Sequence, residues 1–243
     1  MNMFATLRRR VSWQYPEWWT LAMSAGAWLV IVNPLAFSSA SHGHHHHAGP
    51  ARLGTIDALR PAGDWMLMIA AMMLPLCVAS IRATADRSLW RRRHRAIATW
   101  LIGYLSVWLV VGVAFSLVAA LPLFDAVSRS STVALLVFVL AAAWQMSPLR
   151  ARALRQCHRS EPLAPAGWRA TRDCVRYGWT TGRHCAITCG ALMLGCLLLG
   201  HDALGLIAMI AATAIGLAER YMIRPDPRWL AASILLLGTL TAL

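Results

Sequence analysis

The chain has 243 residues, of which 58% are hydrophobic and only 14% are charged, and its mean hydropathy is +0.52. A soluble domain of this length carries about a quarter charged residues, so the composition excludes an ordinary soluble protein and predicts an integral membrane protein. The formal charge of +13 comes from arginine alone, because the chain has no lysine. In a membrane protein such a charge is explained without nucleic acid as a partner.

Seven apolar segments are long enough to cross the hydrocarbon layer of a membrane as helices, which takes about 20 residues each. In chain order these segments are 18–38, 64–82, 96–120, 131–147, 183–200, 203–221 and 228–243. The last two are short or closely spaced, so six spans are the alternative. The expected fold is therefore all-α: a polytopic transmembrane helix bundle that forms a single integral membrane domain over residues 1–243.

The arginines indicate the orientation of these spans. With the N-terminus in the cytoplasm, 20 of the 23 arginines fall in inner segments, and only Arg52, Arg60 and Arg129 fall in outer ones. This distribution follows the positive-inside rule. It predicts a multi-pass protein of the bacterial plasma membrane, whose basic inner side faces the anionic headgroups of the lipid bilayer.

A histidine-rich segment lies in the loop 39–63, which this orientation places outside the cell. The stretch SHGHHHHAGP contains His42, His44, His45, His46 and His47. Histidine-rich tracts bind Zn, Ni or Cu(II) loosely, and this loop faces the compartment from which ions arrive. We expect it to collect metal ions, and the alternative is a flexible polar loop that binds ions only in vitro.

The second expected span, with the sequence DWMLMIAAMMLPLC, is rich in soft sulfur ligands. Helical spacing places Met66, Met73 and Cys77 on one face, and Met68 and Met72 on the adjoining face. Pro75 has no backbone N–H, so it should free the carbonyl of Ala71 and kink the helix. The span is therefore expected to bend close to its sulfur ligands.

The fifth expected span, GRHCAITCGALMLGC, carries Cys185, Cys189 and Met193 at intervals of four residues. At about 1.5 Å per residue, Cys77 and Cys189 should lie at one depth, and Met73 and Met193 at a deeper level. Thiolates and thioethers select Cu(I) over harder ions. If the two spans touch, the candidate copper ligands are Cys185, Cys189, Met193, Met72, Met73, Met68 and Cys77. The alternative is that these residues only fill space between helices.

The long inner segment 148–182 is rich in arginine and has a helical pattern of its own. Trp168, Thr171, Val175, Gly178 and Trp179 share one helical face, and Arg169, Arg172 and Arg176 share another. This pattern favours a basic amphipathic helix that lies in the cytoplasmic interface of the membrane. The alternative is an ordinary basic loop.

Ionisable residues are missing from the middle of every expected span. Such residues mark proton relays and haem or ion sites, so their absence argues against a proton-coupled transporter and against a haem protein. Glu219, beside Arg220, is expected to anchor the sixth span at the membrane interface. Small residues suited to close helix packing recur on the sixth and fifth spans, at Ala208, Ala212 and Gly216 and at Ala186 and Gly190.

Five motifs point to a known family: DWMLMIAAMMLP, GYLSVW (103–108), WQMSPLRARALRQC (144–157), GWTTGRHCAITCGALM (178–193) and a closing AER. With these motifs, over about residues 60–225, the chain resembles a family of bacterial and archaeal proteins described as predicted metal-binding integral membrane proteins, a domain of unknown function. The resemblance implies metal binding. It extends to Trp65, Met68, Met72, Met73, Pro75, Gln145, Pro148, Leu149, Cys157, Gly182, Cys185, Cys189, Met193 and Glu219. The chain departs from the family at Thr188, where a cysteine is usual, at Gly190, where tryptophan is usual, and at Arg220, where lysine is usual.

The leading hypothesis is a multi-pass membrane protein, not an enzyme, that binds a soft transition metal, Cu(I), and transfers or delivers it. The alternative is a structural or accessory subunit of a larger, copper-dependent membrane complex, with arginine-rich inner loops that dock partner subunits. A third hypothesis is a redox enzyme that uses Cys157, Cys174 and Cys185 at the inner face, although none of these forms a Cys-x-x-Cys pair.

Overall fold

The computed structural model describes residues 15–33, 55–119, 131–157, 159, 161–199, 203–221 and 226–242. All regular elements in these ranges are helical, which confirms the all-α prediction. The elements are α2 (Trp18–Val32), α4 (Thr55–Met73), the 3-10 turn η1 (Pro75–Cys77), α5 (Val78–Asp86), the 3-10 turn η2 (Trp90–Arg92), α6 (Arg93–Ala119), α8 (Ser131–Gln145), α9 (Pro148–Cys157), α10 (Gly167–Leu199), α11 (Ala203–Tyr221) and α12 (Pro227–Ala242). The predicted histidine ligands His42, His44, His45, His46 and His47 lie outside the described residues.

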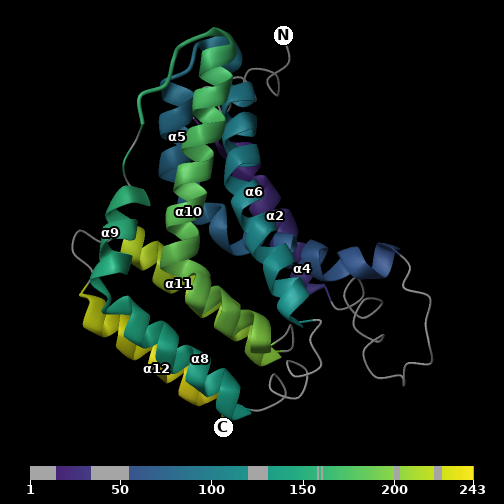
Figure 1. Ribbon diagram of the computed structural model, residues 1–243, viewed down its shortest axis with the longest axis vertical. Helices are drawn as coiled ribbons and strands as arrows, with labels where there is room; N and C mark the ends of the chain where they lie inside the picture. Colours follow the sequence, from purple (N-terminus) through teal and green to yellow (C-terminus); the bar gives the residue numbers. More distant parts are fainter. Residues whose placement is uncertain are drawn as a thin grey trace, which may run out of the picture.

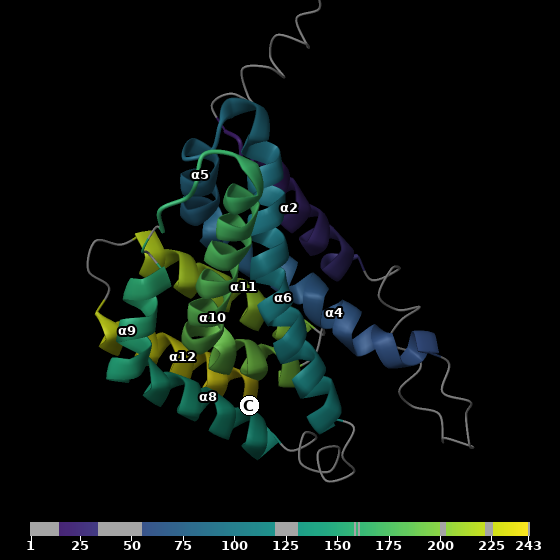
Figure 2. The ribbon, with the colours of Figure 1, turned by 45° about the horizontal axis from the view of Figure 1, so that its top comes forward.

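The helices form two groups that α10 joins. One group contains α2, α5 and α6, and the other contains α8, α9, α11 and α12, with α8 and α12 side by side (Figures 1 and 2). The long helix α10 packs against α6 in the first group and against α8, α9 and α11 in the second. The break between α4 and α5 lies beside α11, so residues from both groups meet there.

Three helical segments of the described chain are long and apolar enough to cross a membrane: Trp90–Val118, Gly167–Leu199 and Ala203–Tyr221. The bent pair Ala62–Met73 and Pro75–Asp86 becomes a fourth if it counts as one span. The described residues therefore support three or four spans, and the expectation of seven is not supported.

The shorter apolar helices show why hydropathy overestimated the number of spans. α2 has 15 residues and extends about 22 Å, against a hydrocarbon thickness of about 30 Å. It ends where Asn33, the residue before Pro34, turns to an extended conformation (ψ 104°), because a residue preceding proline is disfavoured in a helix. α8, also of 15 residues, has the same shortfall. A run of apolar residues shows how many side chains can be buried. The length of the helix that these residues form depends on where the helix ends.

Pro75 bends the second expected span, as predicted. α4 ends at Met73, η1 begins at Pro75, and the two halves of the span meet at 48°. The carbonyl of Ala71, four residues before the proline, accepts hydrogen bonds from two side chains of α2: Ser24 Oγ at 2.8 Å and Trp28 Nε1 at 3.0 Å. The break is therefore held in place by α2, which satisfies the carbonyl that proline cannot.

The segment 148–182 differs from its prediction. It contains two helices, and the second begins at Gly167 and continues without interruption to Leu199, a length of 33 residues or about 50 Å. The amphipathic part is thus the first half of α10 and is continuous with the fifth expected span, not a separate interfacial helix. The first half of α10 packs against α6, where Gly178 allows direct contact with the α6 backbone.

Among the described glycines, the closest contacts with another helix backbone lie between α6 and α10, a pair that the small-residue pattern did not select. A Cβ built on Gly178 would lie 2.0 Å from the Trp100 carbonyl oxygen, and one on Gly103 would lie 2.1 Å from the Val175 carbonyl oxygen. Gly190, an expected counterpart on the fifth span, has no atom within 4 Å of such a Cβ. Gly216 does pack closely, but against the Leu76 side chain of η1. Glycine is therefore required where two helix backbones touch.

Candidate metal centre

Cys185 of α10 is fully buried and lies at the meeting point of three other elements. The Tyr104 hydroxyl of α6 donates to Cys185 Sγ at 3.2 Å, and Arg220 Nη2 of α11 donates to it at 3.4 Å. The thiol itself faces Met73 Sδ, at the end of α4, at 3.9 Å. The structure thus joins Cys185 and Met73, two of the predicted ligands, across 112 residues of sequence.

A second thiol, that of Cys77 in η1, completes this cysteine site. It is fully buried and lies within hydrogen-bonding reach of the Cys185 thiol and of the Tyr104 hydroxyl. The sequence matched Cys77 in depth with Cys189, but Cys77 reaches Cys185, one helical turn earlier on α10. The reason is the bend of 48° at Pro75, which turns η1, and with it Cys77, away from the axis of α4.

Cys189, whose thiol also lies close to the Cys185 thiol, and three methionines line a small cavity of about 10 Å³. The walls of this cavity include the predicted ligands Met72, Met73, Cys189 and Met193. Its volume matches about one water-sized sphere. Gln145 also lines it, and the Gln145 Oε1 atom is buried without a hydrogen-bond partner in the described part of the chain. Met68 is fully buried too, but it does not line this cavity.

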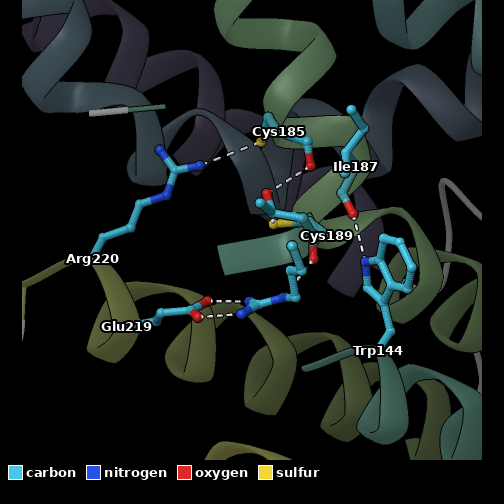
Figure 3. Close-up of polar contacts among 8 residues, drawn as sticks. Trp144, Cys185, Ile187, Cys189, Glu219 and Arg220 are labelled. Atoms are coloured by element: carbon cyan, nitrogen blue, oxygen red, sulfur yellow. Dashed lines mark hydrogen bonds and ion pairs between the residues drawn. The ribbon is translucent and has the colours of Figure 1, made fainter. Parts of the chain in front are cut away.

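A buried ion pair that includes Glu219 lies beside this cavity. Glu219 of α11 forms a bidentate pair with Arg150 of α9, with Arg150 Nη1 and Glu219 Oε1 2.6 Å apart, and both side chains are buried (Figure 3). Arg150 Nε also donates to the Thr188 carbonyl of α10 at 3.2 Å. The pair joins α9 to α11 next to Cys189. Whether Glu219 anchors the sixth span at the membrane interface stays a prediction.

Arg220 follows Glu219 in the chain but points the other way, toward Cys185 (Figure 3). Its Nη1 donates to the Leu76 carbonyl of η1 at 2.7 Å. Two residues that the sequence reasoning did not select, Tyr104 and Arg220, therefore contact the sulfur of Cys185. The available signals were the motif GYLSVW, which contains Tyr104, and the closing AER, which contains both charged residues of α11.

A family model described as a copper chaperone, PpoB2, matches residues 62–242. The chain belongs to this family. The match begins before the broken span and ends in α12, so it covers every residue of the cysteine site and of the cavity. No curated protein and no solved structure matches the chain. Membership of the PpoB2 family indicates a copper-related function, in agreement with the metal binding expected from the resemblance.

The residues at the site can be tested against copper, the cargo that the PpoB2 description names. No group of three or more His, Cys, Asp and Glu side chains in the described ranges is arranged to hold a metal ion. The donors closest to Cys185 are the thioether of Met73 and the thiols of Cys77 and Cys189. Such a set is poor for Ca, which takes oxygen ligands, and a thioether is not a usual ligand of Zn, whereas thiolates and thioethers both suit Cu(I). The donor chemistry therefore fits Cu(I).

Proposed function

We propose that this protein is a membrane copper chaperone that holds Cu(I) between η1 and α10 and passes it on within or across the bilayer. The observation that carries the proposal is the convergence of the Cys77 and Cys185 thiols, with Met73 Sδ 3.9 Å from Cys185 Sγ. In this proposal the protein is multi-pass, resides in the bacterial plasma membrane with its N-terminus in the cytoplasm, and is not an enzyme. The outer histidine tract would then collect ions for the buried site.

Met73 offers a route by which bound copper could move. It contacts Cys185 on one side and lines the cavity with Met72, Cys189 and Met193 on the other. Thioethers bind Cu(I) but carry no charge, so they hold it less firmly than thiolates do. We infer that the ion exchanges one soft ligand at a time, from the cysteine site through Met73 to the methionine-lined cavity.

The experiment that tests this function is Cu(I) titration of the purified protein against a chromogenic Cu(I) chelator. The double variant Cys77→Ser/Cys185→Ser keeps the size of both side chains and removes both thiols, so it should lose the tightly bound copper. Cys196→Ser is the matched control, because Cys196 is also a free and fully buried cysteine of α10, and it should bind as the wild type does. Stoichiometric Cu(I) in the double variant would exclude the proposed site.

The proposed orientation has its own test. A thiol-specific reagent that cannot cross the membrane should label an Ala48→Cys variant in intact cells. Labelling only after the cytoplasmic side is exposed would reverse the topology and remove the collecting role of the histidine tract.

A second candidate function is that of an accessory subunit in a larger copper-dependent membrane complex. The observation that favours it is the lack, within the described residues, of three His, Cys, Asp or Glu side chains placed around one point. In that case ligands from a partner subunit would complete the coordination of the copper ion. Copper bound by the isolated protein with full affinity would argue against this candidate, and copper bound only in the presence of a co-purifying partner would support it.

A further inference from the structure

We propose that Arg220 is the built-in counter-ion of the cysteine site and makes the site selective for a monovalent soft ion, Cu(I), over divalent ions. This inference rests on the proposed copper-binding function and assigns a specificity-determining role to a residue outside the predicted ligand set. The observation behind it is that the Arg220 guanidinium contacts a cysteine thiol and, within the described residues, forms no ion pair with a carboxylate.

The surroundings of Arg220 are unusual for an arginine within a span. Its two terminal nitrogens donate to the Leu76 carbonyl at 2.7 Å and to Cys185 Sγ at 3.4 Å. Four cysteines, Cys77, Cys157, Cys185 and Cys189, are its neighbours, and Cys185 is in direct contact with it. Glu219, the adjacent carboxylate in the sequence, is engaged by both terminal nitrogens of Arg150. Within the described ranges, no carboxylate forms an ion pair with Arg220.

A charge in this position has a large effect on which ion can be bound. Two thiols that take up Cu⁺ release two protons and form a bis-thiolate complex with a net charge of −1. The guanidinium of Arg220 brings the sum to zero, so the loaded site buries no net charge. The same two thiolates with Zn²⁺ or Cd²⁺ are already neutral, and Arg220 would then be left as an unbalanced cation. Arg220 is partly buried, and an unbalanced charge that is partly removed from water is disfavoured relative to a balanced one.

Arg220 could instead serve only to hold the Leu76 carbonyl at the helix break, and two substitutions separate these roles. Arg220→Gln keeps a hydrogen-bond donor but removes the charge. Arg220→Lys keeps the charge. Arg155→Gln removes a charge from an exposed position of α9 and is the matched control. The wild type and the three variants are titrated with Cu(I), Ag(I), Zn(II) and Cd(II), each against a competing chelator. Their folding is checked by thermal unfolding.

We expect Arg220→Gln to weaken Cu(I) and Ag(I) binding by about 10- to 100-fold, the size of a lost charge-assisted interaction. Its Zn(II) and Cd(II) affinities should stay the same or rise, while Arg220→Lys and Arg155→Gln should keep the selectivity of the wild type. An unchanged ratio of Cu(I) to Cd(II) affinity in folded Arg220→Gln would overturn the role of Arg220. Copper retained by Cys77→Ser/Cys185→Ser would instead overturn the proposed function itself.

A second measurement covers the case in which Arg220→Gln does not fold. The wild-type ratio of Ag(I) to Cd(II) affinity is compared with that of a small ligand that carries two thiols and one thioether, such as bis(2-mercaptoethyl) sulfide, which has the same kinds of donor and no counter-ion. A larger ratio in the protein supports the proposal, and an equal or smaller ratio contradicts it.

Discussion

Replacing Gly178 by alanine should open the contact between α6 and α10. The added Cβ would lie 2.0 Å from the Trp100 carbonyl oxygen. Contacts between carbon and a carbonyl oxygen normally measure about 3.3–3.6 Å, so the two helices must separate by more than about 1 Å. Both clashing atoms belong to rigid helical backbone or are attached directly to it, so no side chain can rotate away.

The magnitude follows from two losses. Overpacking of a tight interface costs about 1–3 kcal/mol, and a rigid backbone contact belongs at the upper end. The same movement stretches the 3.2 Å hydrogen bond from Tyr104 to Cys185, which is worth about 1 kcal/mol. Against this, alanine is favoured over glycine in a helix by about 0.5–1 kcal/mol. The free energy of unfolding should therefore fall by about 3 kcal/mol.

Gly190→Ala in the same helix is the control, because its Cβ would have no atom within 4 Å. It should raise the free energy of unfolding by up to about 1 kcal/mol. Both variants are measured by reversible unfolding in mixed detergent micelles. Equal stability of Gly178→Ala and the wild type, or a similar loss in Gly190→Ala, would refute the close backbone contact on which this reasoning depends.

Two further predictions concern buried polar groups outside the cysteine site. Arg150→Met or Glu219→Leu alone should lower the free energy of unfolding by about 3–5 kcal/mol, because each leaves one buried partner unbalanced; the combination Arg150→Met/Glu219→Leu should lose clearly less than the sum, as a double-mutant cycle would show. Burial raises the pKa of the Cys157 thiol to about 11, so the neutral thiol persists above the usual range. Its alkylation rate, followed by mass spectrometry of the peptide, should then rise about tenfold per pH unit through pH 9 and level off only near pH 11; a plateau near pH 9 would contradict the burial of this thiol.

The local chemistry of the site could be predicted from the sequence because it depends on neighbours in the chain. Pro75 lacks an N–H wherever it is placed in a helix, so the break and the carbonyl of Ala71 follow directly. The four-residue spacing of Cys185 and Cys189 places both on one helix face in any fold. The depth comparison matched Met73 with Met193, and both line one cavity, but it did not place Met73 beside Cys185.

The charged residues could not be predicted in the same way, because their burial depends on helices distant in the sequence. Arg150 lies in a basic segment that the positive-inside rule assigns to the cytoplasmic side. Only the packing of α9 against α10 brings its guanidinium to Glu219 and to the Thr188 carbonyl. A sequence pattern predicts that each charged residue is exposed, because it takes no account of partners. A bidentate ion pair lowers the cost of burying both charged groups.

The proline break connects the architecture of the protein to its proposed selectivity. Breaking the helix at Pro75 places Cys77 next to Cys185 and leaves carbonyls at the junction that need donors from other helices. Ala71 receives its donors from α2, and Leu76 receives Arg220 Nη1 from α11. The guanidinium brought to the break by the Leu76 carbonyl therefore arrives beside the thiols as well. Because its planar group donates in two directions at once, one residue can hold the broken helix and balance a copper–thiolate charge. A single ammonium group at this position would keep the charge but hold the two partners less rigidly, so the two roles of Arg220 should separate in stability and in metal selectivity.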